Sequence, residues 1–479
     1  MRDNVPLSLF GQNRLPRTSY REARLTRMTL RMTVIGLLFL MGGCSQEGSS
    51  RDGRLHLTYW EKWTGFELEA RQKVVDLFNA SQDRIFVDLL SISEIDRKLM
   101  VAIAGGNPPD IAGLFSEFVP VLVDQNAIYP LDGYLERAGI TGDDFLDIYW
   151  RAGDYEGHVW SLPTCGNVLA LHYNKAQFRE AGLDPGKPPV TLEDLRALDE
   201  KLTFVTPSGI QRAAFLPSEP DWWPYVWPIF FGGAYWDGES KVTLTSPEMV
   251  EAYEWVAGYS ERLGVEKVQA FRSGFGKIFA SPQNPFLSGK ISSTFQGEWM
   301  FNFVEKYNPR LELGVAPMPT KTRDLYGTSL AESDIIFIPK GVRHPEESFE
   351  FIQFITNQEC SEIFTSGMRS ISPRKERSQE YLKNHPNPQF HLYDELVKSD
   401  KARFSPQIPM WYEMLDEMRD VFDNVWLHRE KPLEALEKAQ RRLQVRLDQD
   451  LERWRRVAPI RRKEWQEMVE RTREGLSPQ

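Results

Sequence analysis

The sequence predicts a mixed α/β fold, because two hydrophobic patterns alternate along its first structured part. Apolar side chains at every second position predict strands at residues 55–60 and 85–89. Apolar side chains at helical spacing predict helices around residues 70–78 and 95–103. A further strand, followed by a short helix, is expected at residues 110–115. Strands separated by helices favour a mainly parallel sheet that is covered on both faces.

The same alternation continues toward the C-terminus. Thr191 is a suitable N-cap for a helix that ends near Leu202, and acidic residues fill its first turn. Pro432 suits the first position of another helix. The other expected elements are a strand at 168–173, Pro-, Gly- and Trp-rich loops at 217–238, a helix at 246–263, a strand at 335–338, and helices at 345–357, 411–422 and 432–451.

The N-terminal residues have the pattern of a secretory signal. Basic residues precede the apolar run from Val34 to Met41, and two glycines and Cys44 follow it. The uncharged stretch of about 15 residues is shorter than the ~20 that cross a bilayer, which disfavours a membrane-spanning helix. The pattern resembles a bacterial lipoprotein signal, in which the cysteine is lipidated. We therefore expect a signal peptide at 1–43, with translation starting at Met1, Met28 or Met32.

This interpretation predicts an extracytoplasmic protein that is anchored to a membrane through acyl chains on Cys44. The small polar residues 44–54 would form a lipidated tether. About 436 residues then remain, which suits two domains. The chain carries a net charge of −10, and residues 1–43 hold seven Arg against two acids, so the remainder is near −15. Such acidity excludes a nucleic-acid-binding protein.

The cysteines and histidines predict no metal or redox site. Cys44, Cys165 and Cys360 are the only cysteines, and the sequence has no CxxC, no HExxH and no cluster of histidines. No cofactor is therefore expected. In an oxidising compartment Cys165 and Cys360 could pair, and the sequence leaves that question open.

Tryptophans beside carboxylates are the strongest functional signal. Fourteen Trp follow Cys44, and several stand in turn-like contexts next to acids or prolines. An indole ring packs against the C–H face of a sugar, and carboxylates bind its hydroxyl groups. Core packing is the alternative for each single Trp. Ligands of α/β proteins bind at the carboxyl ends of strands, which is where Trp60 and Trp63 are expected. The residues of this kind are Trp60, Trp63, Glu67, Trp222, Trp223, Glu298, Trp299 and Trp411.

Several short motifs in order resemble family 1 extracellular solute-binding proteins of ABC sugar importers, the group that contains maltodextrin-binding proteins. The matching segments extend from Leu55 to Ala439. They are Gly105–Ile111, Leu162–Thr164 with Leu171–Lys175, Trp227-Pro228 with Gly232-Gly233, Phe286–Lys290 with Gly297–Trp299, and Pro409–Tyr412 with Leu433–Leu436.

The resemblance implies a periplasmic-binding-protein-like type II fold, with two discontinuous α/β lobes, a hinge and a ligand cleft between the lobes. Lobe 1 would comprise residues 53–164 and 325–368, and lobe 2 residues 166–322 and 372–440. Residues 441–479 contain eleven basic and seven acidic residues with a hydrophobic stripe at helical spacing. This charged helical extension would either lie on the body of the protein or dock on a membrane or partner.

The resemblance also implies roles for single residues. Trp299 matches the sugar-stacking tryptophan of the family, and Trp411 matches a second aromatic platform. Glu117 matches a carboxylate that binds hydroxyl groups, and Asn167 stands where maltodextrin binders have a carboxylate. Trp222 and Trp223 match the loop that lines the cleft, and Arg369 lies near the second crossing between the lobes.

These observations lead to one main hypothesis and two alternatives. The protein would be a monomeric, lipid-anchored carbohydrate receptor that closes on its ligand and delivers it to an ABC permease; it would not be an enzyme. One alternative keeps the fold and changes the ligand to glycerol-phosphate or another small polar solute. The other is a secreted glycan-processing enzyme that uses Glu117 and Glu298 as an acid/base pair.

Overall fold

The computed structural model describes residues 53–275 and 279–478. The predicted signal peptide (1–43), its start, Cys44 and nearly all of the predicted tether lie outside the described residues. Within the described part of the chain, no helix combines the length and the apolar character needed to span a bilayer.

The strands confirm the predicted mixed α/β class and follow the expected order. Thr191 and Asp194 form the capping box expected at the start of their helix, with Asp194 N donating to Thr191 Oγ1 over 3.1 Å. The strands are β1 (Leu55–Glu61), β2 (Ile85–Ser91), β3 (Ile111–Phe115), β4 (Asp154–Tyr155), β5 (His158–Val159), β6 (Leu162–Asn174), β7 (Phe204–Thr206), β8 (Gly209–Arg212), β9 (Ser293–Gly297), β10 (Leu313–Ala316), β11 (Ser329–Phe337) and β12 (Ala402–Arg403).

The helices account for most of the remaining described chain. They are α1 (Gly65–Ser81), α2 (Ile95–Ala104), α3 (Val119–Asp124), α4 (Asp132–Ala138), α5 (Asp147–Gly153), α6 (Lys175–Glu180), α7 (Leu192–Leu202), α8 (Pro247–Leu263), α9 (Val265–Ser273), α10 (Met300–Tyr307), α11 (Pro345–Ile355), α12 (Gln358–Met368), α13 (Gln379–Asn384), α14 (Phe390–Lys398), α15 (Trp411–Trp426) and α16 (Pro432–Arg473). Short 3-10 helices include η1 (Ser116–Phe118) and η3 (Trp227–Phe231).

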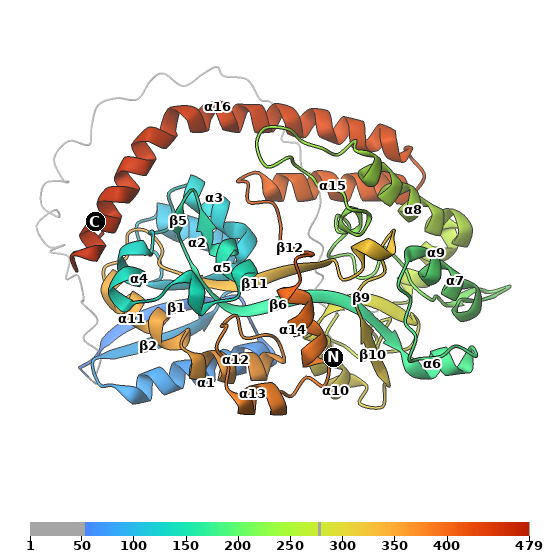
Figure 1. Ribbon diagram of the computed structural model, residues 1–479, viewed down its shortest axis with the longest axis horizontal. Coiled ribbons are helices and arrows are strands. Elements are labelled where there is room, and N and C mark those ends of the chain that lie inside the picture. The colour runs from blue at the N-terminus through green and yellow to red at the C-terminus, as the bar shows by residue number, and fades with distance from the viewer. Residues whose placement is uncertain (1–52, 276–278, 479) are drawn as a thin grey trace, which may run out of the picture. The chain divides into compact units, whose positions relative to one another are not determined.

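The main sheet is mixed, so the expectation of a mainly parallel sheet is wrong. Among the described residues it has the order β10-β6-β11-β3-β1-β2, with β9 beside β6 and β12 beside β11. Parallel pairing is confined to β1 with β2, β1 with β3 and β11 with β12. The long strands β6 and β11 run antiparallel to each other and extend through the middle of Figure 1. No single helix connects these two strands, so the right-handed parallel crossover does not apply to them.

Buried apolar side chains form two large cores on different segments of the chain. The first core draws on residues between Leu57 and Cys165 and between Ile336 and Met368. The second draws on residues between Leu169 and Met318, on Leu330, and on residues between Ile408 and Leu447. Strands β6 and β11 contribute to both cores and therefore connect them. The exact lobe limits named above stay a prediction.

The predicted C-terminal extension, residues 441–479, forms most of one helix, α16, which begins at Pro432 as expected and continues well past residue 451. Its first half packs on α15 and α8, where Leu443 and Leu447 belong to the second core. Its far end packs on α4, where Trp465 is buried against Trp160. Figure 1 shows α16 passing from α8 and α15 to the region of α4 and β5. The extension thus lies along the body of the protein over its whole helical length.

Cys165 and Cys360 are both buried free thiols in this structure. Cys165 Sγ lies 2.6 Å from Ser370 Oγ, and burial raises its pKa well above the ordinary value. The two cysteines therefore pack as small core residues, and no disulfide joins them.

Candidate ligand-binding site

A cavity of about 400 Å³ opens where the carboxyl ends of β1 and β3 meet the crossing strands β6 and β11. Parallel strands end at the same edge of a sheet, and side chains that follow them converge there. The lining residues come from both of the large cores and are mostly aromatic or acidic. They are Trp63, Glu67, Phe115, Glu117, Asn167, Leu169, Trp222, Trp223, Tyr225, Trp299, Phe303, Leu330, Glu332, Met368 and Ser370.

The two crossing strands supply polar groups at the middle of the cavity. Glu332 in β11 pairs directly with Asn167 in β6 in the antiparallel register. Strand side chains alternate between faces, so Leu330 and Leu169 line the same cavity two positions along each strand. A carboxylate and an amide are thereby held side by side on two strands that both cores share.

One wall consists of three indole rings. Trp222 and Trp223 lie in the loop between β8 and η3, with their ring centroids 5.4 Å apart. Trp223 is 6.0 Å from Trp299, which directly precedes α10. The Trp299 ring lies back over the end of β9, and a Cβ at Gly297 would overlap it. The Gly-x-Trp motif therefore has a local cause, since only glycine leaves room for this ring position.

A second wall carries Trp63, two residues past the end of β1, and Phe115, the last residue of β3. Their rings meet edge to face with centroids 5.7 Å apart. Trp63 Nε1 donates to Asp334 Oδ2 over 2.8 Å, which fixes the orientation of the indole. The ammonium group of Lys62 lies 4.7 Å from the Trp63 centroid and 4.5 Å from the Phe115 centroid.

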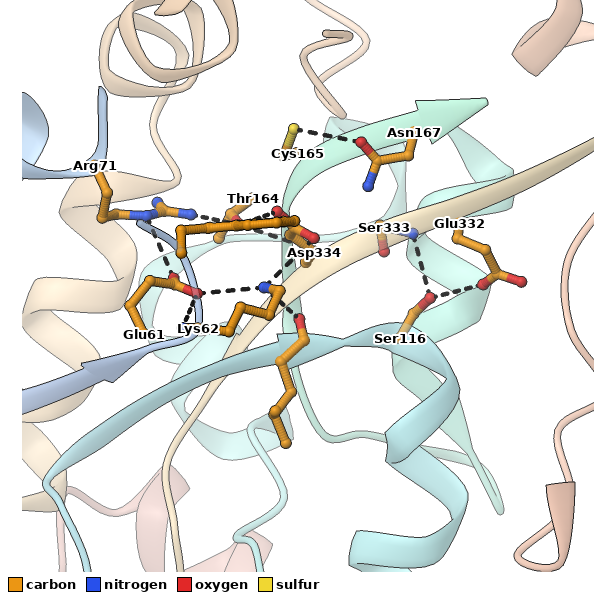
Figure 2. Close-up of polar contacts among 12 residues, drawn as sticks. Glu61, Lys62, Arg71, Ser116, Thr164, Cys165, Asn167, Glu332, Ser333 and Asp334 are labelled. Atoms are coloured by element: carbon orange, nitrogen blue, oxygen red, sulfur yellow. Dashed lines mark hydrogen bonds and ion pairs between the residues drawn. The ribbon is translucent and has the colours of Figure 1, made fainter. Parts of the chain in front are cut away.

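A network of four buried charges supports this wall, and Figure 2 shows how its members converge. Lys62 Nζ lies 3.3 Å from Glu61 Oε1 and 3.4 Å from Asp334 Oδ1. Arg71 Nε lies 3.6 Å from Glu61 Oε2. Burial alone would raise the pKa of Glu61, but Lys62 and Arg71 outweigh it and hold that pKa below its ordinary value. Two cations and two carboxylates thus balance one another.

Three further carboxylates face the cavity. Burial raises the pKa of Glu67 to about 7, and Asp334 adds to the shift. Burial and the nearby Glu332 raise the pKa of Glu117 to about 8. Burial also raises the pKa of Glu332, although hydrogen bonds from Ser405 and Ser116 oppose this. Ser116 Oγ donates to Glu332 Oε2 over 3.0 Å, as Figure 2 shows.

The structure brings together most of the residues that the sequence singled out. The cavity-lining set contains seven of them: Trp63, Glu67, Glu117, Asn167, Trp222, Trp223 and Trp299. Four others, Trp60, Glu298, Arg369 and Trp411, lie outside it, each for a physical reason.

Trp60 does not reach the cavity because of the strand pleat, and Glu298 does not reach it because its side chain is buried. The side chain of Trp60 belongs to the opposite face of β1, where it packs on the cluster that contains Ile95 and Leu99. Glu298 is fully buried, and its Oε2 accepts a hydrogen bond of 3.1 Å from Val168 N.

Arg369 and Trp411 are displaced by other contacts. Arg369 ends α12 in a left-handed conformation (φ 58°), and its side chain forms an ion pair with Glu305, while its neighbours Met368 and Ser370 line the cavity. Trp411 is buried in the second core, with its ring 5.6 Å from that of Tyr225. Tyr225, which does line the cavity, is therefore supported by Trp411.

Sequence reasoning missed several lining residues, of which Glu332 is the most informative. The expected strand at 335–338 begins after Glu332, whereas the strand in the structure, β11, begins at Ser329. Acidic residues just before the apolar run at 335–338 were the available signal. Phe115, Tyr225 and Ser370 were missed because their positions depend on long-range packing.

The acidic groups do not form a metal site: among residues 53–275 and 279–478, no group of three or more His, Cys, Asp or Glu could hold a metal ion.

A mixed α/β chain with two cores, joined by crossing strands and sharing one aromatic cavity, has the architecture of a ligand-binding protein. The chain matches the family model of bacterial extracellular solute-binding proteins over residues 68–359, which is more than half of its length. The chain therefore belongs to the bacterial extracellular solute-binding protein family, whose members act outside the cytoplasm.

Two of the similar proteins match most of the chain at low identity, and a third matches less than a third of it. A putative binding protein of Brucella abortus is 23% identical over 422 residues, which cover 86% of this chain and 98% of the relative. The structure of CpMnBP1, solved with mannobiose and with mannotriose bound, is 26% identical with a TM-score of 0.72, covering 81% of this chain and 99% of that one. An sn-glycerol-3-phosphate-binding periplasmic protein of Shigella flexneri is 30% identical over 150 residues, covering 29% of this chain and 34% of the relative.

Proposed function

We propose that this protein is an extracytoplasmic receptor that binds a sugar or oligosaccharide and delivers it to an ABC permease. The observation that carries the proposal is a cavity lined by four indole rings and three carboxylates. The flat rings suit the C–H face of a pyranose, and the carboxylates and Asn167 suit its hydroxyl groups. Membership of the solute-binding family supports this assignment.

The proposed mechanism is closure of two lobes about the crossing strands. Trp63, Glu67 and Glu117 come from the part of the chain that forms the first core, whereas Trp223 and Trp299 pack against the second. A ligand that contacts both groups binds the closed arrangement more tightly than the open one and so shifts the population toward closure. A permease could then distinguish loaded from empty receptor by its shape.

We also propose that Cys44 carries the lipid anchor and that the receptor acts as a monomer beside its permease. The order of basic residues, apolar run, Gly42-Gly43 and Cys44 supports the anchor. Mass spectrometry of the protein purified from its own host membranes tests this directly: an acylated N-terminal Cys44 is expected, and a chain that retains residues 1–43 would contradict it.

Isothermal titration with a panel of neutral and charged mono- and oligosaccharides tests the binding function. Saturable heat with at least one sugar is expected, and Trp299→Ala should weaken that binding. Val445→Ala, which alters an exposed side chain on α16 far from the lining residues, is a suitable control. Folded protein that gives no saturable heat with any carbohydrate would defeat the proposal.

Glycerol-phosphate is the competing ligand class, and the charge of the cavity disfavours it. Phosphate is bound by Arg, Lys or the N-termini of helices. The described lining residues include no Lys, Arg or His, and Glu67 occupies the first turn of α1, one of the helices that begin at the cavity. A phosphate would therefore meet three carboxylates and no cation on the cavity surface.

A glycan-processing enzyme receives little support from the geometry. The acid/base pair considered from the sequence, Glu117 and Glu298, is not assembled, because Glu298 is buried between β6 and β9 and bound to Val168 N. The family consists of substrate-binding proteins. Incubation with a glycan mixture should release no reducing ends; their appearance would revive this alternative.

A further inference from the structure

We propose that the ligand is a cationic carbohydrate: an amino sugar whose free, protonated amine binds between Glu117 and Glu332 and the aromatic walls. This inference rests on the proposed carbohydrate-binding function and adds the charge of the ligand to it. It depends on four observations: the charge balance beneath the cavity, the excess of hydrogen-bond acceptors on its surface, the aromatic faces, and an acidic oxygen that has no partner.

The buried charges beneath Trp63 leave no cation for the cavity. Glu61 and Asp334 are matched by Lys62 and Arg71, and all four side chains are almost fully buried. Lys62 is fixed further by a 3.2 Å hydrogen bond to Leu114 O, and Arg71 by one of 2.9 Å to Thr164 Oγ1. Both cations are thus committed to carboxylates outside the lining set.

Glu67, Glu117 and Glu332 consequently have no cation among the described lining residues. Removing a carboxylate from water is costly unless a cation or hydrogen-bond donors compensate. Glu332 is partly compensated, since its Oε1 accepts from Ser405 N over 2.8 Å and its Oε2 from Ser116 Oγ. Glu117 is not: its Oε2 is shielded from solvent and has no hydrogen-bond partner in the described structure.

The cavity also has more acceptors than free donors. When ionised, three carboxylates offer about twelve acceptor sites, of which Glu332 already uses some for Ser405 and Ser116. The indole N–H groups of Trp63 and Trp299 already donate to Asp334 and Gln296, so the side-chain donors that remain beside Asn167 are chiefly Trp222, Trp223 and Tyr225. Asn167 supplies one amide group between the two strands. A neutral hydroxyl brings an acceptor with every donor, but an ammonium group brings three donors and no acceptor. An ammonium therefore matches this surface better than a hydroxyl does.

The aromatic walls suit a cation as well as a sugar face. A cation within about 6 Å of an aromatic centroid is attracted by the negative face of the ring, most strongly by tryptophan. The molecule already uses this contact at one wall, where the Lys62 ammonium lies 4.5 Å from the Phe115 centroid and 4.7 Å from that of Trp63. Trp223, Trp299 and Tyr225 provide comparable rings around the cavity itself.

The protonation of the carboxylates supports the same conclusion and gives a second readout. Burial and Glu332 raise the pKa of Glu117 to about 8, so it is largely protonated near pH 7 in the free protein. The other titratable groups that act on this region are Lys62, Asp334, Tyr225 and Tyr412. A bound ammonium favours the ionised carboxylate, so binding should release protons, whereas a neutral sugar should not cause this release.

The experiment compares matched sugars by isothermal titration at pH 6.5. Glucosamine, galactosamine, mannosamine and the β-1,4 dimer and trimer of glucosamine are each measured beside the N-acetyl and the neutral counterpart. At least one amine should bind ten times more tightly than both counterparts. Repeating the titration in buffers of different ionisation enthalpy should show proton release for the amine only.

Variants assign the effect to the two carboxylates. Glu117→Gln with Glu332→Gln should bring the amine and the neutral sugar to within about threefold of each other and abolish the proton release. Glu312→Gln, which alters an exposed carboxylate paired with Arg179 outside the lining set, should retain the preference. Circular dichroism and urea unfolding establish that each variant is folded.

The outcomes separate the two proposals. A neutral or N-acetyl sugar that binds as tightly as every matched amine would overturn the cationic ligand and leave the carbohydrate function standing. Absence of saturable binding by any sugar, charged or neutral, would overturn both. An amine preference that survives in the double variant would overturn the assignment to Glu117 and Glu332.

Discussion

Replacing Gly297 by alanine should disturb the aromatic wall without touching any ligand atom directly. The added Cβ would lie 2.5 Å from Trp299 Cε3 and closer still to two other ring carbons. Carbon atoms in contact are about 3.5–4.0 Å apart, so the ring has to move by about 1 Å or more. Trp299 packs near Trp223, and its movement therefore changes the wall formed by the indole rings.

The magnitude follows from these contacts. Forcing an extra methyl group into packed surroundings typically costs about 1–3 kcal/mol of stability. Losing the alignment of one aromatic contact in the cavity should cost about 0.5–1.5 kcal/mol of binding. Since about 1.4 kcal/mol is a tenfold change, the dissociation constant for the cognate sugar should rise about two- to tenfold.

Urea unfolding and isothermal titration measure the two effects on one variant. Gly258→Ala is the matched control, because Gly258 lies in α8 with open space around its Cα, and alanine there should stabilise the helix by about 0.5–1 kcal/mol. A Gly297→Ala protein that is as stable as the parent and binds sugar as tightly would refute the argument that this glycine positions Trp299.

Three further predictions concern stability. Trp465→Ala should reduce the free energy of unfolding by about 3–5 kcal/mol, because the Trp465 ring is 1% exposed and packs on Trp160. Ile460→Ala, on the exposed side of α16, should change the free energy of unfolding by less than about 0.5 kcal/mol. Urea unfolding measures both values. Lys62→Met should cost about 3–5 kcal/mol, because Arg71 alone then faces the two buried carboxylates Glu61 and Asp334. A loss no larger than that of Lys438→Met, which removes an exposed ion pair, would contradict the charge balance described above. Burial and Glu332 raise the pKa of Glu117 to about 8, so the folded state holds a proton that the unfolded state releases near pH 4.5. The contribution of Glu117 to stability should therefore be present at low pH and be lost as the pH rises toward 8, with a slope of about 1.4 kcal/mol per pH unit at most. Glu117→Gln should remove this contribution from unfolding curves measured from pH 5 to 8.

The local sequence pattern predicted a cavity residue correctly where its location depends only on its position along one strand. Trp63 lies two residues past the end of β1, and the rule that parallel strands end at one edge places it at the cavity. Glu117, two residues past β3, was predicted instead from the resemblance to the solute-binding family. The same rule failed for Trp60, three residues earlier than Trp63, because the pleat turns it to the other face of the sheet. Proximity to a strand end therefore predicts that a residue lies near the cavity, whereas the strand pleat determines which face of the sheet its side chain occupies.

Long-range pairing determined what the sequence could not predict. Glu332 reaches the cavity because β11 crosses beside β6 and sets Glu332 opposite Asn167, and no nearby residue signals that pairing. Tryptophans flanked by prolines and acids were equally ambiguous. Trp222 and Trp223 face the cavity, whereas Trp411 packs in the core behind Tyr225. The sequence shows which side chains could bind a ligand, but the orientation of each side chain depends on residues that are distant along the chain.

The length of α16 has a mechanical consequence. A helix of 42 residues extends about 63 Å, and this one is fastened near its start by Leu443 and Leu447 and near its end by Trp465. Rotation of one core about the crossing strands must therefore bend the rod, slide it or detach one end. Pro459 lacks an N–H and weakens the backbone between the two attachments, which makes it the natural place for a bend. The residues of α16 therefore contribute to the free energy of any opening or closing of the two cores, although α16 supplies none of the described residues that line the cavity.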